Sequence, residues 1–120
     1  MKRKNNSPEY PIQVLREQLR SRAQQQSLLL SRSVSRLTSW DAQPCPEYGE
    51  EVEAEYETID RLLYLQQCRA ALERCLTRGR ARLRYRWRDG RVSQTDFRRS
   101  APGRVTARGL EPEQPAARAA

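Results

Sequence analysis

The residues with the clearest chemical potential are the arginines that alternate with apolar and aromatic residues from Arg80 to Arg88. A repeat of two residues is typical of a β-strand, because successive side chains of a strand point to opposite faces. Such a strand would present one row of guanidinium groups. Because a guanidinium group can donate two parallel hydrogen bonds to a phosphate or a carboxylate, we predict that this row binds a nucleic acid backbone or an acidic protein surface.

The row is expected to continue around a hairpin. Asp89-Gly90 follows the strand, and this dipeptide favours a two-residue type I′ turn, which would place Trp87 opposite Val92. Tyr85 and Trp87 could stack on unpaired bases, although the alternation puts them on the face opposite the arginines, where packing on a helix is the competing interpretation. The candidate nucleic-acid-binding residues are Arg80, Arg82, Arg84, Arg86, Arg88 and Arg91.

The sequence lacks the residues that most enzymes use. No histidine is present, which removes the commonest general acid or base, the Ser-His pair and the commonest metal ligand. No P-loop or G-x-G-x-x-G motif occurs. The three cysteines, Cys45, Cys68 and Cys75, form no C-x-x-C pair, which argues against a disulfide scaffold or a zinc site. We therefore expect a non-enzymatic protein without cofactor or metal, located inside the cell (cytoplasm or nucleus) or in a virion.

Length and composition limit the core. The chain has 120 residues, of which 37% are hydrophobic and 32% charged, and its net charge is +8. A single small domain follows from this length, and its buried surface is marginal, so we expect a homo- or hetero-oligomer. No run of 18 apolar residues occurs, and no membrane span is predicted.

Charge divides the chain into blocks. Residues 1–37 carry a net +6, residues 41–60 a net −8 and residues 61–99 a net +9. Arginine outnumbers lysine 21 to 2, which fits selection for forked donors or, alternatively, a coding sequence that favours arginine codons. Because the acidic and the second basic block are adjacent, the sequence also predicts that the acids compete with external polyanions for the arginines.

Two amphipathic helices are expected to position the hairpin. Apolar residues recur at helical spacing from Ile12 to Leu37, and Pro11 suits the first helical position. A second helix is predicted over 51–78, with Gly79 closing it in a left-handed conformation. Its apolar stripe consists of Leu62, Leu65, Cys68, Leu72, Cys75 and Leu76.

The predicted fold class is mainly α with a small β-hairpin: two amphipathic helices, which could pair as a coiled coil, then the Arg-rich hairpin, then a disordered tail. The predicted divisions are a basic helical segment (1–37), a linker (38–50), a helix-plus-hairpin core (51–100) and the tail (101–120). Residues 93–100 allow two interpretations. The segment from Ser93 could begin a short helix with a capping arrangement, or it could continue the return strand of the hairpin. Pro102-Gly103 ends either element, and the remainder lacks periodicity.

One set of motifs combines the end of the second helix with the hairpin: Arg69-Ala70-Ala71-Leu72, Leu76, Gly79, Asp89-Gly90-Arg91, Ser93 and Asp96. Over about Ile59 to Arg99 these positions resemble a known family, the small phage head-completion proteins of the gpW type. The resemblance implies a helix, a hairpin and a second helix, and a structural role at the capsid portal that joins head to tail. The hairpin alone is also similar to the DNA-contacting strands of phage-integrase arm-binding domains.

These observations favour a strongly basic binding protein whose Arg-rich hairpin contacts the phosphate backbone of a nucleic acid. The alternative is a structural adaptor, such as a head–tail joining protein, whose arginines contact acidic protein surfaces. The sequence does not separate DNA, RNA and protein as partners.

Overall fold

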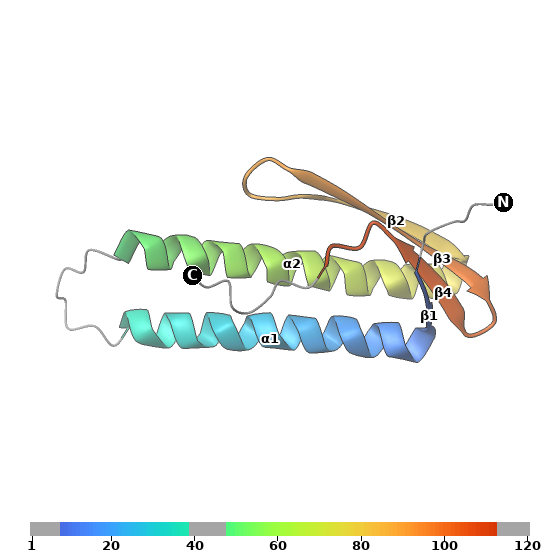
Figure 1. Ribbon diagram of the computed structural model, residues 1–120, viewed down its shortest axis with the longest axis horizontal. Helices are drawn as coiled ribbons and strands as arrows, with labels where there is room; N and C mark the ends of the chain where they lie inside the picture. Colours follow the sequence, from blue (N-terminus) through green and yellow to red (C-terminus); the bar gives the residue numbers. More distant parts are fainter. Residues whose placement is uncertain (1–7, 39–47, 113–120) are drawn as a thin grey trace.

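The computed structural model of the protein describes residues 8–38 and 48–112. A helical hairpin lies against one face of a four-stranded antiparallel sheet, so the fold has two layers (Figure 1). The elements follow one another as β1 (Glu9–Pro11), α1 (Ile12–Thr38), α2 (Tyr48–Arg78), β2 (Arg80–Arg86), β3 (Val92–Ala101) and β4 (Arg104–Arg108).

Both predicted helices are present, and α2 begins three residues before its predicted start. Gly79 ends α2 as expected: its φ is +93°, and its N–H donates to the Cys75 carbonyl at 2.7 Å. This is the left-handed closure that glycine adopts at low cost. Arg99 reaches across from β3 and donates to the Leu76 carbonyl at 2.7 Å, so a cation also lies at the negative end of the helix dipole.

The predicted fold class is wrong, because the sheet has four strands in the order β1-β4-β3-β2 instead of a single hairpin. Residues 92–101 form β3, so the helix that the phage resemblance implies after the hairpin is absent. Residues 104–108 of the predicted tail form β4, which pairs with both β3 and β1. Residues 113–120 of the predicted tail lie outside the described residues, as does most of the predicted linker.

The turn before β4 explains why the tail folds back. Pro102-Gly103 joins Ala101 to its partner Arg104, and the φ of Gly103 is +78°. Proline followed by a glycine with positive φ is the pair that a tight type II turn requires. Pro102-Gly103, which was expected to end an element, therefore connects two strands.

The predicted type I′ turn between β2 and β3 is also wrong. The observed register pairs Arg86 with Val92, and the Trp87 N–H donates to the Arg91 carbonyl at 2.8 Å. The loop therefore has three residues, with Gly90 at a φ of +96°, as in the hairpins that end in a left-handed glycine. The Asp89 carboxylate stabilises this longer loop by accepting the Arg91 N–H at 2.9 Å.

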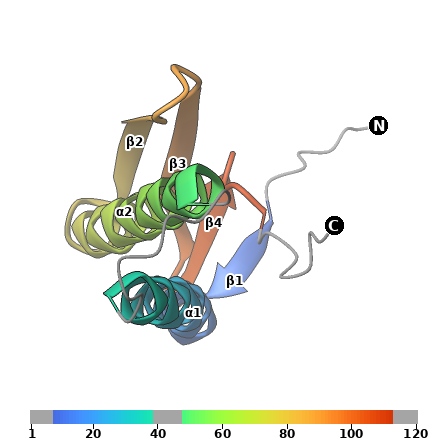
Figure 2. The ribbon, with the colours of Figure 1, turned by 90° about the vertical axis from the view of Figure 1, so that its left-hand side faces the viewer.

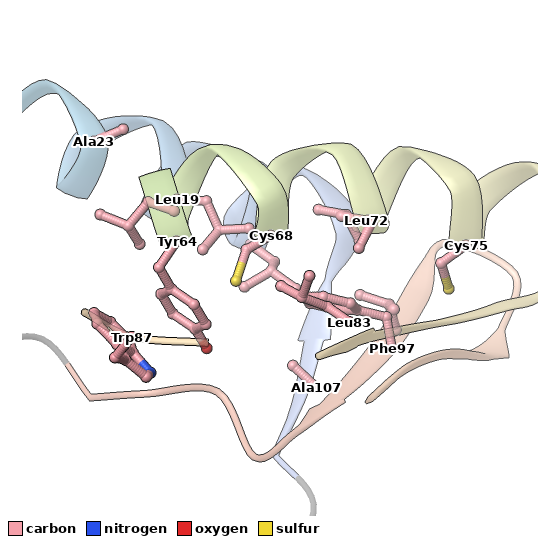
Figure 3. Close-up of a cluster of buried hydrophobic side chains, with 14 residues drawn as sticks. Leu19, Ala23, Tyr64, Cys68, Leu72, Cys75, Leu83, Trp87, Phe97 and Ala107 are labelled. Atoms are coloured by element: carbon pink, nitrogen blue, oxygen red, sulfur yellow. The ribbon is translucent and has the colours of Figure 1, made fainter. Parts of the chain in front are cut away.

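The core lies between the inner face of the sheet and the two helices (Figure 3). Seen end-on, the β2 side of the sheet covers α2, and β1 lies beside α1 (Figure 2). Tyr64 of α2 and Phe97 of β3 are among the largest fully buried side chains. Two cysteines of α2, Cys68 and Cys75, are buried here as free thiols. This agrees with their expected role as small apolar residues on one face of the helix.

Candidate nucleic-acid interface

The outer face of the sheet, which points away from the helices, carries arginines from β2, β3 and β4. Directly opposite residues of neighbouring strands share a face, and one such line crosses all four strands through Arg80, Arg98, Thr106 and Glu9. Alternate residues along each strand follow the same face. We call the exposed arginines of this face the arginine face; they are Arg80, Arg82, Arg84, Arg86, Arg98, Arg104 and Arg108.

Among the described residues, only two acids share this face. Asp96 Oδ1 lies 2.9 Å from the Nε of Arg82, and Glu9 Oε1 lies 3.6 Å from the Nε of Arg104. Within the described part of the chain, the other five arginines of the face have no ion pair. The face therefore keeps an excess of positive charge that its own acids do not neutralise.

The arrangement even places like charges against each other, since Arg80 lies directly opposite Arg98. Such a pair destabilises a sheet, and an uncharged residue at either position would make the folded protein more stable. Alternate positions along β2 are about 6.6 Å apart, which is close to the separation of neighbouring phosphates along a nucleic acid strand. The geometry therefore suits an extended polyanion.

Four of the six predicted arginines belong to the arginine face, and the other two do not. The guanidinium carbon of Arg88 lies 4.3 Å from the centroid of the Tyr56 ring on α2. That of Arg91 lies 4.7 Å from the centroid of Trp87, and its Nη1 lies 3.5 Å from Glu111 Oε2. Both side chains therefore help to anchor the hairpin loop to the rest of the protein.

The two candidate stacking residues point toward the helices. Trp87 is 7% exposed, and its ring centroid lies 4.9 Å from that of Tyr85 and 5.1 Å from that of Tyr64. The indole Nε1 of Trp87 donates to the Ser93 hydroxyl at 2.7 Å. None of the described residues on the outer face is aromatic, so base stacking has no ring available there.

Asp60 of α2 sets the orientation of the hairpin. Its Oδ1 accepts the Tyr85 hydroxyl at 2.6 Å, and its Oδ2 accepts the backbone N–H of Arg88 at 2.8 Å. Burial and then this hydrogen bond to a carboxylate raise the pKa of the Tyr85 hydroxyl well above its usual value. One carboxylate therefore ties both the strand and its loop to the helix layer.

Sequence reasoning missed three members of the arginine face: Arg98, Arg104 and Arg108. A signal for two of them was present, since Arg104-Val-Thr-Ala-Arg108 also alternates with the period of a strand. Arg98 had no such signal, because the ambiguous segment around it fitted a helix equally well.

The acidic block lies with the helix layer. Its described side chains, Glu55, Glu57 and Asp60, belong to α2, which packs on the inner face of the sheet. Glu50, Glu51 and Glu53 lie in the first turns of α2, and their side chains are outside the described residues. The sheet thus stands between the described acids and the arginine face, while the predicted competition with external polyanions stays a prediction.

The other candidate sites have less support as binding sites. A cavity of about 360 Å³ lies beside the hairpin loop and is lined by four carboxylates and four arginines. Its lining therefore has no excess of either charge. The described residues contain no group of three or more metal-ligating side chains. In the same residues, neither helix is long and apolar enough to cross a membrane. Burial raises the pKa of the Cys68 thiol to about 11, which keeps it protonated and unreactive.

Comparison with known proteins assigns no family to this chain: no protein-family model, no curated protein and no solved structure matches it.

Proposed function

We propose that the protein is a non-enzymatic nucleic-acid-binding protein that contacts the phosphate backbone through its arginine face. The observation that carries the proposal is the composition of that face, which in the described part of the chain has seven arginines against two acids. The phosphate backbone dominates the affinity of such proteins, because each neutralised phosphate releases condensed counterions.

The same face favours a duplex over unpaired bases. Single-stranded sites combine basic side chains with exposed aromatic rings on which bases stack. Here Tyr85 and Trp87 pack against Tyr64 on the other side of the sheet. Arginines without exposed rings favour contacts to phosphates, which position a protein on a duplex but carry no sequence information. We therefore expect binding to be independent of sequence.

A salt titration of duplex binding tests the proposal. The variant replaces Arg80, Arg84 and Arg86 with Gln, because all three lie on β2 and lack an ion pair among the described residues. Each phosphate contact contributes about 0.9 to the slope of log affinity against log salt on duplex DNA. The slope should therefore fall by roughly two to three units.

A matched control removes the same charge from the helix layer. The exposed helical residues Arg32, Arg69 and Arg74 are replaced with Gln, which changes the net charge equally. The control slope should fall by less than about one unit, because only contacts with phosphate count. Equal slopes for variant and control, with both proteins folded by circular dichroism, would overturn the proposal and favour the adaptor that contacts acidic protein surfaces.

A further inference from the structure

In the part of the chain that the structure describes, the sheet ends in an open edge at β2. Within the described residues β2 pairs only with β3, and no strand lies beyond it. β2 has seven residues, whereas β1 at the opposite edge has three and ends in Pro11. A proline and a short length discourage pairing, so β2 is the edge that can accept another strand.

The hydrogen-bond pattern shows which residues offer their backbone to that edge. The N–H of Trp87 donates to Arg91, and that of Arg99 donates to Gly79, so the odd-numbered positions of β2 bond with β3. Residues of an antiparallel strand alternate between bonding with one neighbour and with the other. The backbone N–H and C=O groups of Arg82, Arg84 and Arg86 therefore point toward the open edge.

The two sides of this edge differ chemically. On the outer side lie the guanidinium groups of the same three arginines. On the inner side lies α2, where Asp60 contacts the hairpin, and residues three or four positions from Asp60 share its side of the helix. Two of these four residues, Tyr56 and Leu63, are 44% and 46% exposed, and the other two are Glu57 and the buried Tyr64.

We propose that the β2 edge binds an extended segment of a partner protein in which acidic and apolar residues alternate. The segment adds a fifth strand and bonds to the backbone of Arg82, Arg84 and Arg86, a mode known as β-augmentation. Side chains opposite the three arginines share the outer face, which suits carboxylates. The intervening side chains share the inner face and lie toward Leu63 and Tyr56.

Charge favours this occupant over a second copy of the chain. Two β2 edges paired with each other would bring two rows of arginines together on one face, and like charges opposite each other destabilise a sheet. Charged side chains on an edge strand are a common means of preventing self-association. The same row attracts a strand of opposite charge. This inference concerns the edge and does not depend on the nucleic-acid proposal, which concerns the face.

Amide hydrogen exchange of the full chain tests it. The probe is an eight-residue peptide that alternates Glu and Val, and the control peptide has the same composition with the four Glu in one block. The alternating peptide should slow exchange at Arg82, Arg84 and Arg86 by about tenfold or more, because new hydrogen bonds protect amides. The amides of Leu83 and Tyr85 already bond with β3 and should change little.

Two variants separate backbone pairing from charge. Arg84→Pro removes the N–H that faces the edge and leaves the bonds to β3, and proline is tolerated at such an edge position. Arg84→Ala removes the same charge but keeps the N–H. Affinity for the alternating peptide, measured by fluorescence anisotropy, should fall about tenfold in the first variant and only about threefold in the second.

Each other outcome contradicts the proposal. Equal binding of both peptides without protection of the edge amides would show a polyanion contact only. Protection that rises with protein concentration, in the absence of peptide, would assign the edge to a second copy. Duplex DNA should leave the edge amides unprotected, so failure of peptide binding and failure of duplex binding are separate results.

Discussion

Removal of the Tyr64 hydroxyl should destabilise the protein through one chain of hydrogen bonds. The Thr95 hydroxyl donates to the Gly109 carbonyl at 3.2 Å, so the Tyr64 hydroxyl must donate to Thr95 Oγ1, at 2.8 Å. The Tyr64 oxygen accepts the backbone N–H of Glu111 at 3.0 Å. The chain ties residues 109–111, which follow β4, to α2 and β3. Tyr64→Phe removes its centre.

The magnitude follows from the groups left without a partner. Tyr64 is 1% exposed and Thr95 is fully buried. Tyr64→Phe leaves the Glu111 N–H without its acceptor, and a buried orphan costs about 1–3 kcal/mol; we expect about 1.5 kcal/mol here. Thr95→Val removes the hydroxyl that accepts the Tyr64 proton and donates to the Gly109 carbonyl. We expect this variant to lose about 2 kcal/mol of stability. The double variant should cost about 1 kcal/mol less than the two single losses together, because neither orphaned hydroxyl remains.

Urea unfolding of the four proteins measures this coupling, with circular dichroism as the check on folding. Amide exchange provides a local measurement, because the Glu111 amide should exchange faster in Tyr64→Phe. Additive losses within about 0.3 kcal/mol, or an unchanged Glu111 amide, would refute the hydrogen-bond chain. The loss would then reflect the packing of the ring edge.

Two further results are expected. Gly109→Ala should destabilise the protein by more than about 2 kcal/mol, because the φ of Gly109 is +81° and a Cβ would collide with the Gln94 carbonyl oxygen. Gly103→Ala has a similar φ but no neighbour within reach of a Cβ, so it should cost only about 1 kcal/mol. Equal losses of stability in thermal unfolding would contradict this expectation. Burial raises the pKa of the Cys68 thiol in the folded protein to about 11, so the unfolded chain loses this proton at a lower pH than the folded protein does. The protonated thiol therefore contributes its full stability below the ordinary thiol pKa, and this contribution is lost as the pH rises toward 11. Urea unfolding at pH 8 and about pH 10.5 should show a loss about 2 kcal/mol smaller in Cys68→Ala than in the parent, and equal losses would show that the thiol is not the cause.

Local sequence signals predicted the parts of the fold that local contacts determine. The alternation from Arg80 gave β2 and its exposed row, and Gly79 gave the end of α2, because both depend on residues close in the chain. The length of the hairpin loop was predicted as two residues, and the structure has three. Asp89-Gly90 alone favours a two-residue loop, but Asp60, far away in the chain, accepts the Arg88 N–H and supports the longer one.

The missing strands depend on pairing between distant segments. β1 has three residues, too few for any periodicity, and it forms because Glu9 to Pro11 pair with Arg104 to Thr106. β4 has five residues and follows Pro102-Gly103, so a sequence pattern alone suggests a break. The arginine face was therefore predicted only along β2. Arg104 and Arg108 alternate locally like strand residues, but only the register of the whole sheet places them and Arg98 on the same face as the β2 arginines.

The face and the edge of β2 share three residues, which links the two proposals physically. Arg82, Arg84 and Arg86 present guanidinium groups to the outer face and backbone groups to the edge. A carboxylate-bearing strand at the edge would place negative charge within a few ångströms of these guanidinium groups and lower the positive potential over the face. Binding free energies are reciprocal, so a duplex on the face would weaken an acidic strand at the edge by the same factor. If both ligands bind, they must therefore oppose each other, and that opposition should diminish as salt screens the shared charges.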